Sequence, residues 1–308
     1  MNRVLIFLIG SAFVLIGLFV MLANPGGQKG NRSATDAGQP TVMLYCAASN
    51  RAVMESIHEA YENEYGVRID IQYGPSQTLL SSIEISHIGD LYLPADDSYL
   101  EMAKQKDLIA ETIPIAKMKA VVAVAKGNPK SIHSYADLVR DDVRLVLANP
   151  DTAAIGNVTR NVLTDADLWK DVADAATAYR ATVNEVAGDI AIGAADAGIV
   201  YDAVLHTYDD VEFVELPELS LAASDIAVGV IRSTKQATRA LHFARYLSAA
   251  DRGLEHYRRF GFHVATGDRW ADHPEPFPAS RLFRQICSVP SRGIFAAEGF
   301  RWQLESDK

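Results

Sequence analysis

Two serines in the first third of the chain have the chemistry and the placement to bind an anion. Ser49 follows an apolar run at residues 42–46, and Ser76 follows an alternating stretch at residues 69–73. Each serine precedes a segment whose apolar residues recur at helical spacing, so each lies where a helix is predicted to begin. The first turn of a helix carries unpaired N–H groups and about half a positive charge, and a serine hydroxyl adds another donor. Two such turns that converge form an anion-binding site.

An ordinary structural role is the alternative for these side chains. Serine and asparagine are favoured N-cap residues, and capping explains Ser49, Asn50 or Ser76 when each is taken singly. The repetition of one strand–loop–helix unit favours binding, because paired helix starts can converge on one ligand.

The elements that position the serines are predicted by hydrophobic periodicity. Residues 42–46 are typical of a buried parallel strand, and residues 53–61 have the spacing of an amphipathic helix that ends at Gly66. Further along, residues 117–124 and 225–231 are apolar and extended, which predicts two crossings between lobes. Strands and helices alternate on both sides of these crossings, so the fold class is α/β.

Seven short segments in register resemble the bacterial molybdate-binding proteins, the periplasmic substrate-binding components of molybdate ABC transporters. The segments are residues 47–49, 73–79, 89–96, 126–129, 148–151 with Gly156, 198–201 and 257–262. The resemblance implies a protein that captures a tetrahedral oxyanion, molybdate or tungstate first, for the permease of an ABC importer. It implies no cofactor and no catalytic residue, a location on the periplasmic side of the cytoplasmic membrane, and a monomer.

The resemblance also assigns the ligand-binding residues. The two anion-binding serines of the family fall on Ser49 and Ser76, its two backbone amides on Ile155 and Val186, and its phenol on Tyr201. Ile155 departs from the family, which usually has a small residue there, and so does Asn50 directly after the first serine. A bulky side chain at residue 155 puts the identity of the anion in doubt more than its class.

The predicted architecture is two doubly wound α/β lobes with a central cleft and two crossover strands, as in the type II periplasmic binding proteins, preceded by an N-terminal transmembrane helix. Lobe one is predicted at residues 41–118 and 226–265, and lobe two at residues 119–225. Residues 266–308 form a C-terminal extension that has no counterpart in the family and either wraps the lobes or offers a partner surface.

Composition agrees with this architecture. The 308 residues are 49% hydrophobic and 22% charged, which suits two lobes with packed cores. The net charge of −10 argues against a nucleic-acid partner. It also means that local dipoles must hold a bound anion against an unfavourable overall field.

The N-terminus is predicted to attach the protein to the membrane. Residues 4–23 carry no charge and are long enough to cross a bilayer, and the sequence Met21-Leu22-Ala23 fits the small-residue pattern of a cleavage site poorly. We therefore predict an uncleaved anchor within residues 1–24, with cleavage and release to the periplasm as the alternative. Residues 25–40 are rich in glycine and polar residues and are predicted to be a flexible linker.

Three other functions compete with oxyanion transport. An enzyme would need an oriented nucleophile and base, and Cys46 with His58 or His87 has no such framework in the sequence. A ferric-ion binder would use phenolates from Tyr45, Tyr73 or Tyr201, which need acidic or histidine ligands beside them. A membrane-anchored oxyanion sensor would keep the same site and signal instead of supplying a permease.

The two cysteines, Cys46 and Cys287, do not have the number or spacing of a zinc site. In an exported protein they could form a disulfide, and the sequence leaves that pairing open.

Overall fold

The computed structural model describes residues 41–270. These residues belong to one compact unit that begins at Pro40. The predicted anchor at residues 4–23, the linker, Cys287 and the extension after Trp270 lie outside the described residues. Within residues 41–270, no helix is long and apolar enough to cross a membrane.

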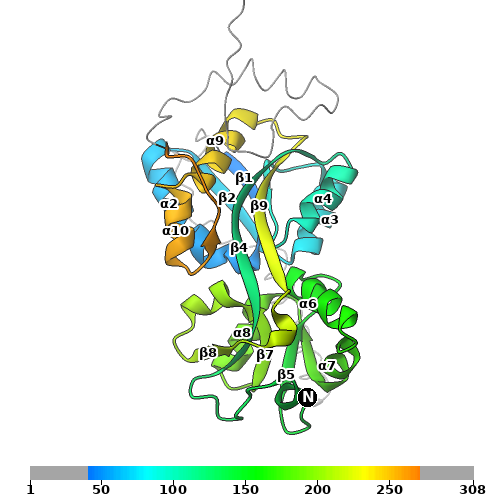
Figure 1. The fold of residues 1–308 in the computed structure, drawn as a ribbon. Helices are drawn as coiled ribbons and strands as arrows, with labels where there is room; N and C mark the ends of the chain where they lie inside the picture. The colour runs from blue at the N-terminus through cyan, green and yellow to red at the C-terminus, as the bar shows by residue number, and fades with distance from the viewer. Residues whose placement is uncertain (1–40, 271–308) are drawn as a thin grey trace, which may run out of the picture. The chain divides into compact units, whose positions relative to one another are not determined.

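Lobe one is built on a mixed sheet (Figure 1). In it β1 lies between β2 and β3 and runs parallel to both, while β9 is antiparallel to β3. The strands are β1 (Thr41–Ala47), β2 (Arg68–Gly74), β3 (Leu91–Leu93), β9 (Ala223–Ile231) and β10 (His263–Val264). The helices are α2 (Arg51–Tyr65), α3 (Ser76–Ser86), α4 (Ser98–Gln105), α9 (Ala237–Ser248) and α10 (Gly253–Arg259).

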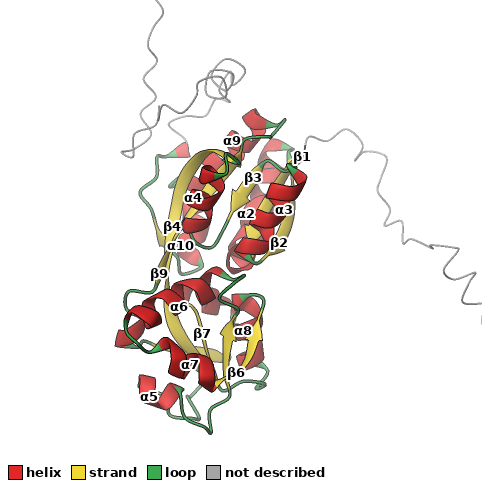
Figure 2. Cartoon of the chain, turned by 90° about the vertical axis from the view of Figure 1, so that its right-hand side faces the viewer, coloured by secondary structure: helices red, strands yellow, loops and turns green. Residues whose placement is uncertain are grey.

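Lobe two repeats the arrangement with a smaller sheet (Figure 2). Here β5 runs parallel to both β6 and β7. The strands are β5 (Leu145–Ala148), β6 (Ala176–Arg180), β7 (Ala197–Tyr201) and β8 (Val211–Val214). The helices are α5 (Tyr135–Leu138), α6 (Ala154–Asp165), α7 (Trp169–Ala175) and α8 (Val183–Ala191), and short 3-10 turns lie at η2 (Ala48–Asn50), η3 (Asp202–Thr207) and η4 (Pro217–Leu219).

A long strand, β4 (Ile109–Ala125), connects the two sheets. Its first part pairs antiparallel with β9, and its last part pairs with β7 and β8. Both crossing segments expected from the sequence therefore lie within longer strands, which pair with each other along most of their length. The fold is therefore a mixed α/β fold in which β4 and β9 connect the two lobes.

Local sequence signals explain where several helices begin and end. Gly66 has a left-handed backbone (φ 64°) and ends α2, a conformation that glycine adopts without a Cβ clash. Thr182 caps α8 by accepting a hydrogen bond from the Glu185 amide, and the Glu185 carboxylate accepts one from the Ala181 amide. Together these two hydrogen bonds form a capping box whose second bond is displaced by one residue.

The described start of the C-terminal extension packs against lobe one. Trp270 is 5% exposed and its indole N–H donates to the Tyr65 hydroxyl at 2.7 Å. Its amide donates to the Asp251 carboxylate at 2.6 Å, and its ring lies edge-on to His242 and Tyr246. Trp270 therefore packs on α2 and α9 of lobe one, in the manner of the first of the two roles that the sequence left open for the extension.

Cys46 is the next-to-last residue of β1, has no exposed surface, and forms no disulfide with another described residue. Burial raises the pKa of this thiol well above its ordinary value, so it is a core residue and a poor nucleophile. Cys287, the other cysteine of the chain, lies outside the described residues.

Candidate functional site

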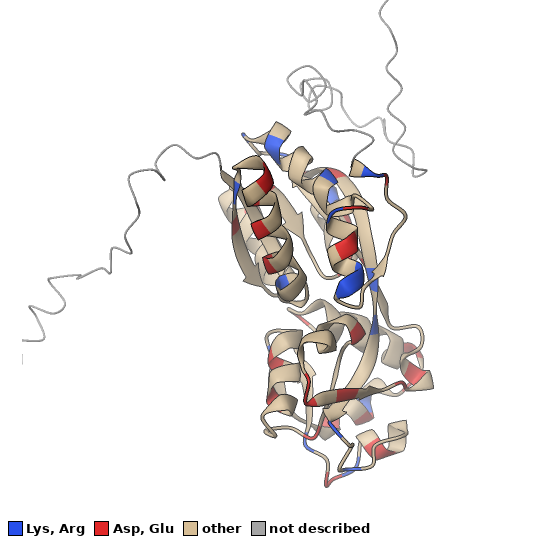
Figure 3. Cartoon of the chain, turned by 90° about the vertical axis from the view of Figure 1, so that its left-hand side faces the viewer, with Lys and Arg blue, Asp and Glu red and all other residues tan. Residues whose placement is uncertain are grey.

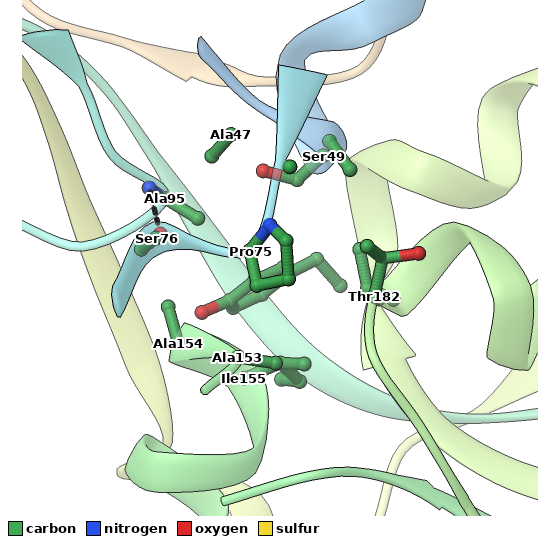
Figure 4. A pocket seen from close by; sticks show the side chains of 13 residues that line it. Ala47, Ser49, Pro75, Ser76, Ala95, Ala153, Ala154, Ile155 and Thr182 are labelled. Atoms are coloured by element: carbon green, nitrogen blue, oxygen red, sulfur yellow. Dashed lines mark hydrogen bonds between the residues drawn. The ribbon is translucent and has the colours of Figure 1, made fainter. Parts of the chain in front are cut away.

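A small pocket lies where the two lobes meet (Figure 4). In lobe one, β1 ends at Ala47 and β2 at Gly74, and in lobe two β7 ends at Tyr201. Ligands of open α/β sheets bind at the carboxyl ends of the strands, so both sheets turn their binding edges to the same space. The pocket is lined by Ala47, Ala48, Ser49, Gly74, Pro75, Ser76 and Ala95 of lobe one and by Ala153, Ala154, Ile155, Thr182, Val183 and Tyr201 of lobe two.

The size of the pocket restricts its ligand. Its volume is about 20 Å³, whereas a bound water needs roughly 10–15 Å³. Alanine, glycine and proline make up most of the lining, so backbone groups come close to the space inside. Beside the pocket, the Gln77 amide of lobe one donates to the Thr152 carbonyl of lobe two at 3.2 Å, which holds the lobes together. The geometry suits a compact ion and not a sugar or an amino acid.

Ser76 is the first residue of α3 and is 2% exposed. Its hydroxyl oxygen accepts a hydrogen bond from the Ala95 amide at 3.1 Å, the dashed line in Figure 4. The Tyr92 hydroxyl donates to the Ser76 carbonyl at 2.8 Å and fixes the backbone. Because the Ser76 hydroxyl oxygen already accepts a hydrogen bond from an amide, the hydroxyl proton remains available to a ligand.

Ser49 lies in the turn η2 between β1 and α2 and is 6% exposed. The side-chain nitrogen of Asn50 is 3.4 Å from its hydroxyl oxygen and donates to it, a long hydrogen bond. Neither Ser49 nor Asn50 caps α2, and no side chain caps α3. The capping alternative for Ser49, Asn50 and Ser76 is therefore wrong, and both serine hydroxyls lie at the pocket instead.

Tyr201 ends β7 and is fully buried, with its hydroxyl 2.7 Å from the Ser224 hydroxyl. When Ser224 donates in this pair, the phenol proton is free for a ligand. Burial raises the pKa of the Tyr201 phenol well above its ordinary value, so the group is a neutral donor at physiological pH. No local sequence signal identifies Ser224 as a partner of Tyr201. Ser224 lies 23 residues after Tyr201 in the chain, on β9.

Helix starts supply the backbone donors. No side chain caps α6, whose first residues Ala154 and Ile155 line the pocket. The first amide that bonds back along α6 belongs to Asn157, so the amides before it have no partner within the helix. Ile155 thus lies where the sequence placed it, and Ala154 is a second candidate beside it.

Val186 does not reach the pocket, which corrects the sequence-based choice. It is the fourth residue of α8, and its amide donates to the Thr182 carbonyl within the helix at 3.4 Å. Its side chain lies against Gly198 of β7. Val183, the first residue of α8, lines the pocket instead. The capping box could have shown this, because only amides before the fourth helical residue are left without a carbonyl partner.

No carboxylate lines the pocket. The acidic side chains considered as acceptors have other partners: Asp151 pairs with Arg160 at 2.7 Å and Asp189 with Arg180 at 2.6 Å. The buried Asp96, which follows the lining residue Ala95, accepts a hydrogen bond from the Ser98 amide at 3.1 Å. Asp202 accepts a hydrogen bond from the Lys119 amide at 3.0 Å. Among residues 41–270, no three His, Cys, Asp or Glu side chains come together as a cation site would require. The donors at the pocket are neutral hydroxyls and amides, which suit an anion.

Two lobes of this fold around a small pocket of donors define a solute-binding protein of the periplasmic type. The chain belongs to the family of bacterial extracellular solute-binding proteins, whose family model matches residues 42–263. This confirms the resemblance drawn from the sequence segments, and the family consists of binding proteins rather than enzymes.

Similar proteins include two named molybdate-binding protein ModA. The one from Mycobacterium tuberculosis is 25% identical over 243 residues, covering 78% of this chain and 90% of the relative. The one from Escherichia coli is 26% identical over 261 residues, covering 81% and 98%. Among solved structures, the periplasmic molybdate-binding protein of Azotobacter vinelandii superposes with a TM-score of 0.64 at 16% identity, covering 73% of this chain and all of that one. The last comparison establishes the fold alone.

Proposed function

We propose that this protein captures a tetrahedral oxyanion outside the cytoplasm and delivers it to the permease of an ABC importer. The proposed ligand is a fully deprotonated dianion, with molybdate or tungstate bound most tightly. Its proposed donors are the hydroxyls of Ser49, Ser76 and Tyr201 and the amides of Ile155 and Val183, the last in place of Val186.

The observation that carries this proposal is the state of the three hydroxyls. Each hydroxyl oxygen has a neighbour that can donate to it: the Ala95 amide for Ser76, the Asn50 side chain for Ser49, and the Ser224 hydroxyl for Tyr201. All three hydroxyl protons can then point to one ligand. Hydrogen bonds to a charged acceptor are stronger than those between neutral groups, so this arrangement favours an anion over a neutral solute.

No carboxylate lines the pocket, so the site has no acceptor for a protonated ligand and is expected to favour fully deprotonated dianions over hydrogen phosphate. Hydrogen phosphate carries its own O–H, which would meet only donors in such a pocket. A buried polar group without a partner costs about 1–3 kcal/mol, or one to two decades of affinity. Sulfate has no such proton, so only its smaller size weakens its contacts relative to molybdate. Ile155 lines the pocket, so the bulk of its side chain bears directly on that size preference.

Competition titrations of the full-length protein with molybdate, tungstate, sulfate and phosphate test this function. We expect molybdate and tungstate to bind most tightly, sulfate less tightly, and phosphate weaker than molybdate by one to two decades. Phosphate binding as tightly as molybdate would contradict a site made only of donors. Sulfate displacing molybdate would keep the site and assign it another ligand.

We further propose that residues 4–23, outside the described part of the chain, remain attached as a membrane anchor. An apolar segment of that length can span a bilayer. Fractionation is expected to recover the protein with the membrane, with its N-terminus intact. A soluble periplasmic form that begins near residue 24 would show cleavage instead. Co-purification with a permease distinguishes import from a sensor function.

A further inference from the structure

A second, larger hollow opens directly onto the pocket. It has a volume of about 420 Å³ and shares four lining residues with the pocket, namely Ala48, Gly74, Pro75 and Thr182. Lobe one contributes Arg51 and Tyr73 to its wall, and lobe two contributes the first turn of α8. A solute that reaches the pocket from this side passes through the hollow.

Arg51 is the one basic residue among those that line the pocket or the hollow. It is exposed, and its guanidinium lies over the Tyr73 ring at 4.2 Å from the ring centre. Within residues 41–270, the Arg51 side chain forms no hydrogen bond or ion pair, so the N–H groups at its edge are free. Stacking on an aromatic face holds a guanidinium in place while leaving that edge open to an anion.

The acidic side chains around the hollow are already engaged. Glu55 accepts a hydrogen bond from His58 at 2.9 Å, and that bond is the main reason why the pKa of Glu55 lies below its ordinary value. Glu185 accepts a hydrogen bond from the Ala181 amide at 3.0 Å. Neither carboxylate is paired with Arg51, although Glu55 is close enough to feel its charge.

We propose that Arg51, held on Tyr73, is a capture site for incoming dianions at the mouth of the pocket, where it raises the rate of association. This inference rests on the proposed oxyanion-binding function. The need for such a site follows from charge: the chain has a net charge of −10, and acidic side chains are spread over both lobes (Figure 3). One exposed cation beside the entrance offsets that field locally, whereas the pocket behind it holds the anion with neutral donors.

Association and dissociation rates of molybdate, measured by stopped-flow intrinsic fluorescence of the full-length protein, test the capture site. Arg51→Gln is expected to slow association about tenfold at low ionic strength and to change dissociation little. The difference is expected to shrink at high ionic strength, where the screening length falls to a few ångströms. Arg51→Lys is expected to keep most of the wild-type rate, because it retains the charge and loses only the stacking plane.

Lys106→Gln is the matched control. It makes the same change in net charge, and Lys106 pairs with Glu84 near the end of α3, whereas the pocket lies at the first residue of that helix. Glu84 follows Ser76 by eight residues of helix, a distance of about 12 Å along the helix axis. This control is expected to slow association much less than Arg51→Gln does, because the Lys106 charge is already paired with a carboxylate.

Wild-type association in Arg51→Gln would overturn the capture site, and so would a slowing of the same size at every ionic strength. Either result leaves the proposed oxyanion function in place as long as the wild-type protein binds molybdate. Failure of the wild-type protein to bind molybdate would remove both the proposed ligand and the capture site.

Discussion

Replacing Ser76 by alanine is expected to weaken oxyanion binding by about one to two decades while the protein stays folded. The substitution removes a hydroxyl that can donate to the anion, and a hydrogen bond to a charged partner contributes roughly 1.5–3 kcal/mol. It also leaves the Ala95 amide, which donates to that hydroxyl at 3.1 Å, without its acceptor beside the pocket. Ser49→Ala is expected to act in the same direction. Isothermal titration with molybdate measures both losses.

Ser82→Ala is the control for this prediction. Ser82 lies in the same helix, is half-buried, and donates its hydroxyl to the Thr78 carbonyl. It makes no contact with the pocket lining, so its removal is expected to leave affinity unchanged. Equal affinities of wild type, Ser49→Ala and Ser76→Ala would show that the serines play no part in holding the anion.

Gly156→Ala is expected to lower the free energy of unfolding by about 1–3 kcal/mol and to weaken anion binding about tenfold or more. A Cβ on Gly156 would lie 2.4 Å from the Ala148 carbonyl oxygen and 2.8 Å from the Pro150 nitrogen. Both are backbone atoms, which cannot rotate out of the way as the end of a side chain can. The start of α6 would therefore shift away from β5, and the amides of Ala154 and Ile155 would move with it.

Gly188→Ala provides the opposite case in α8, the other helix of lobe two that begins at the pocket. Gly188 lies inside α8, and an added Cβ there meets nothing within 4 Å. Alanine is preferred to glycine in a helix, so this variant is expected to gain about 0.5–1 kcal/mol. Urea denaturation and titration of both variants measure the contrast. Unchanged stability and affinity in Gly156→Ala would show that α6 adjusts without cost.

The sequence predicted the described elements well where local periodicity was strong. Residues 42–46 lie in a strand, and helices begin close to Ser49 and Ser76 as the apolar spacing indicated. By contrast α7 (Trp169–Ala175) and β6 (Ala176–Arg180) were not predicted. Strand β6 alternates between half-buried and exposed residues, so its pattern lacks the apolar run that marks a central strand.

Part of the candidate site could also be predicted from the sequence. The lining contains four of the five residues expected, namely Ser49, Ser76, Ile155 and Tyr201. The fifth, Val186, lies about one helical turn after Val183, the residue of α8 that lines the pocket. The helix was identified correctly, and the error lay in which of its amides remains without a carbonyl partner.

By itself, the sequence determined the α/β class, the alternation of strands and helices, and the placement of two serines at helix starts. Each of these features depends on residues within a few positions of one another. The tertiary structure alone decided which way the donors point. The Ala95 amide lies 19 residues from Ser76, and Ser224 lies 23 residues from Tyr201. The hydrogen bonds that free these hydroxyl protons form only when separate strands pack side by side, and the pocket exists only where two sheets bring their strand ends together.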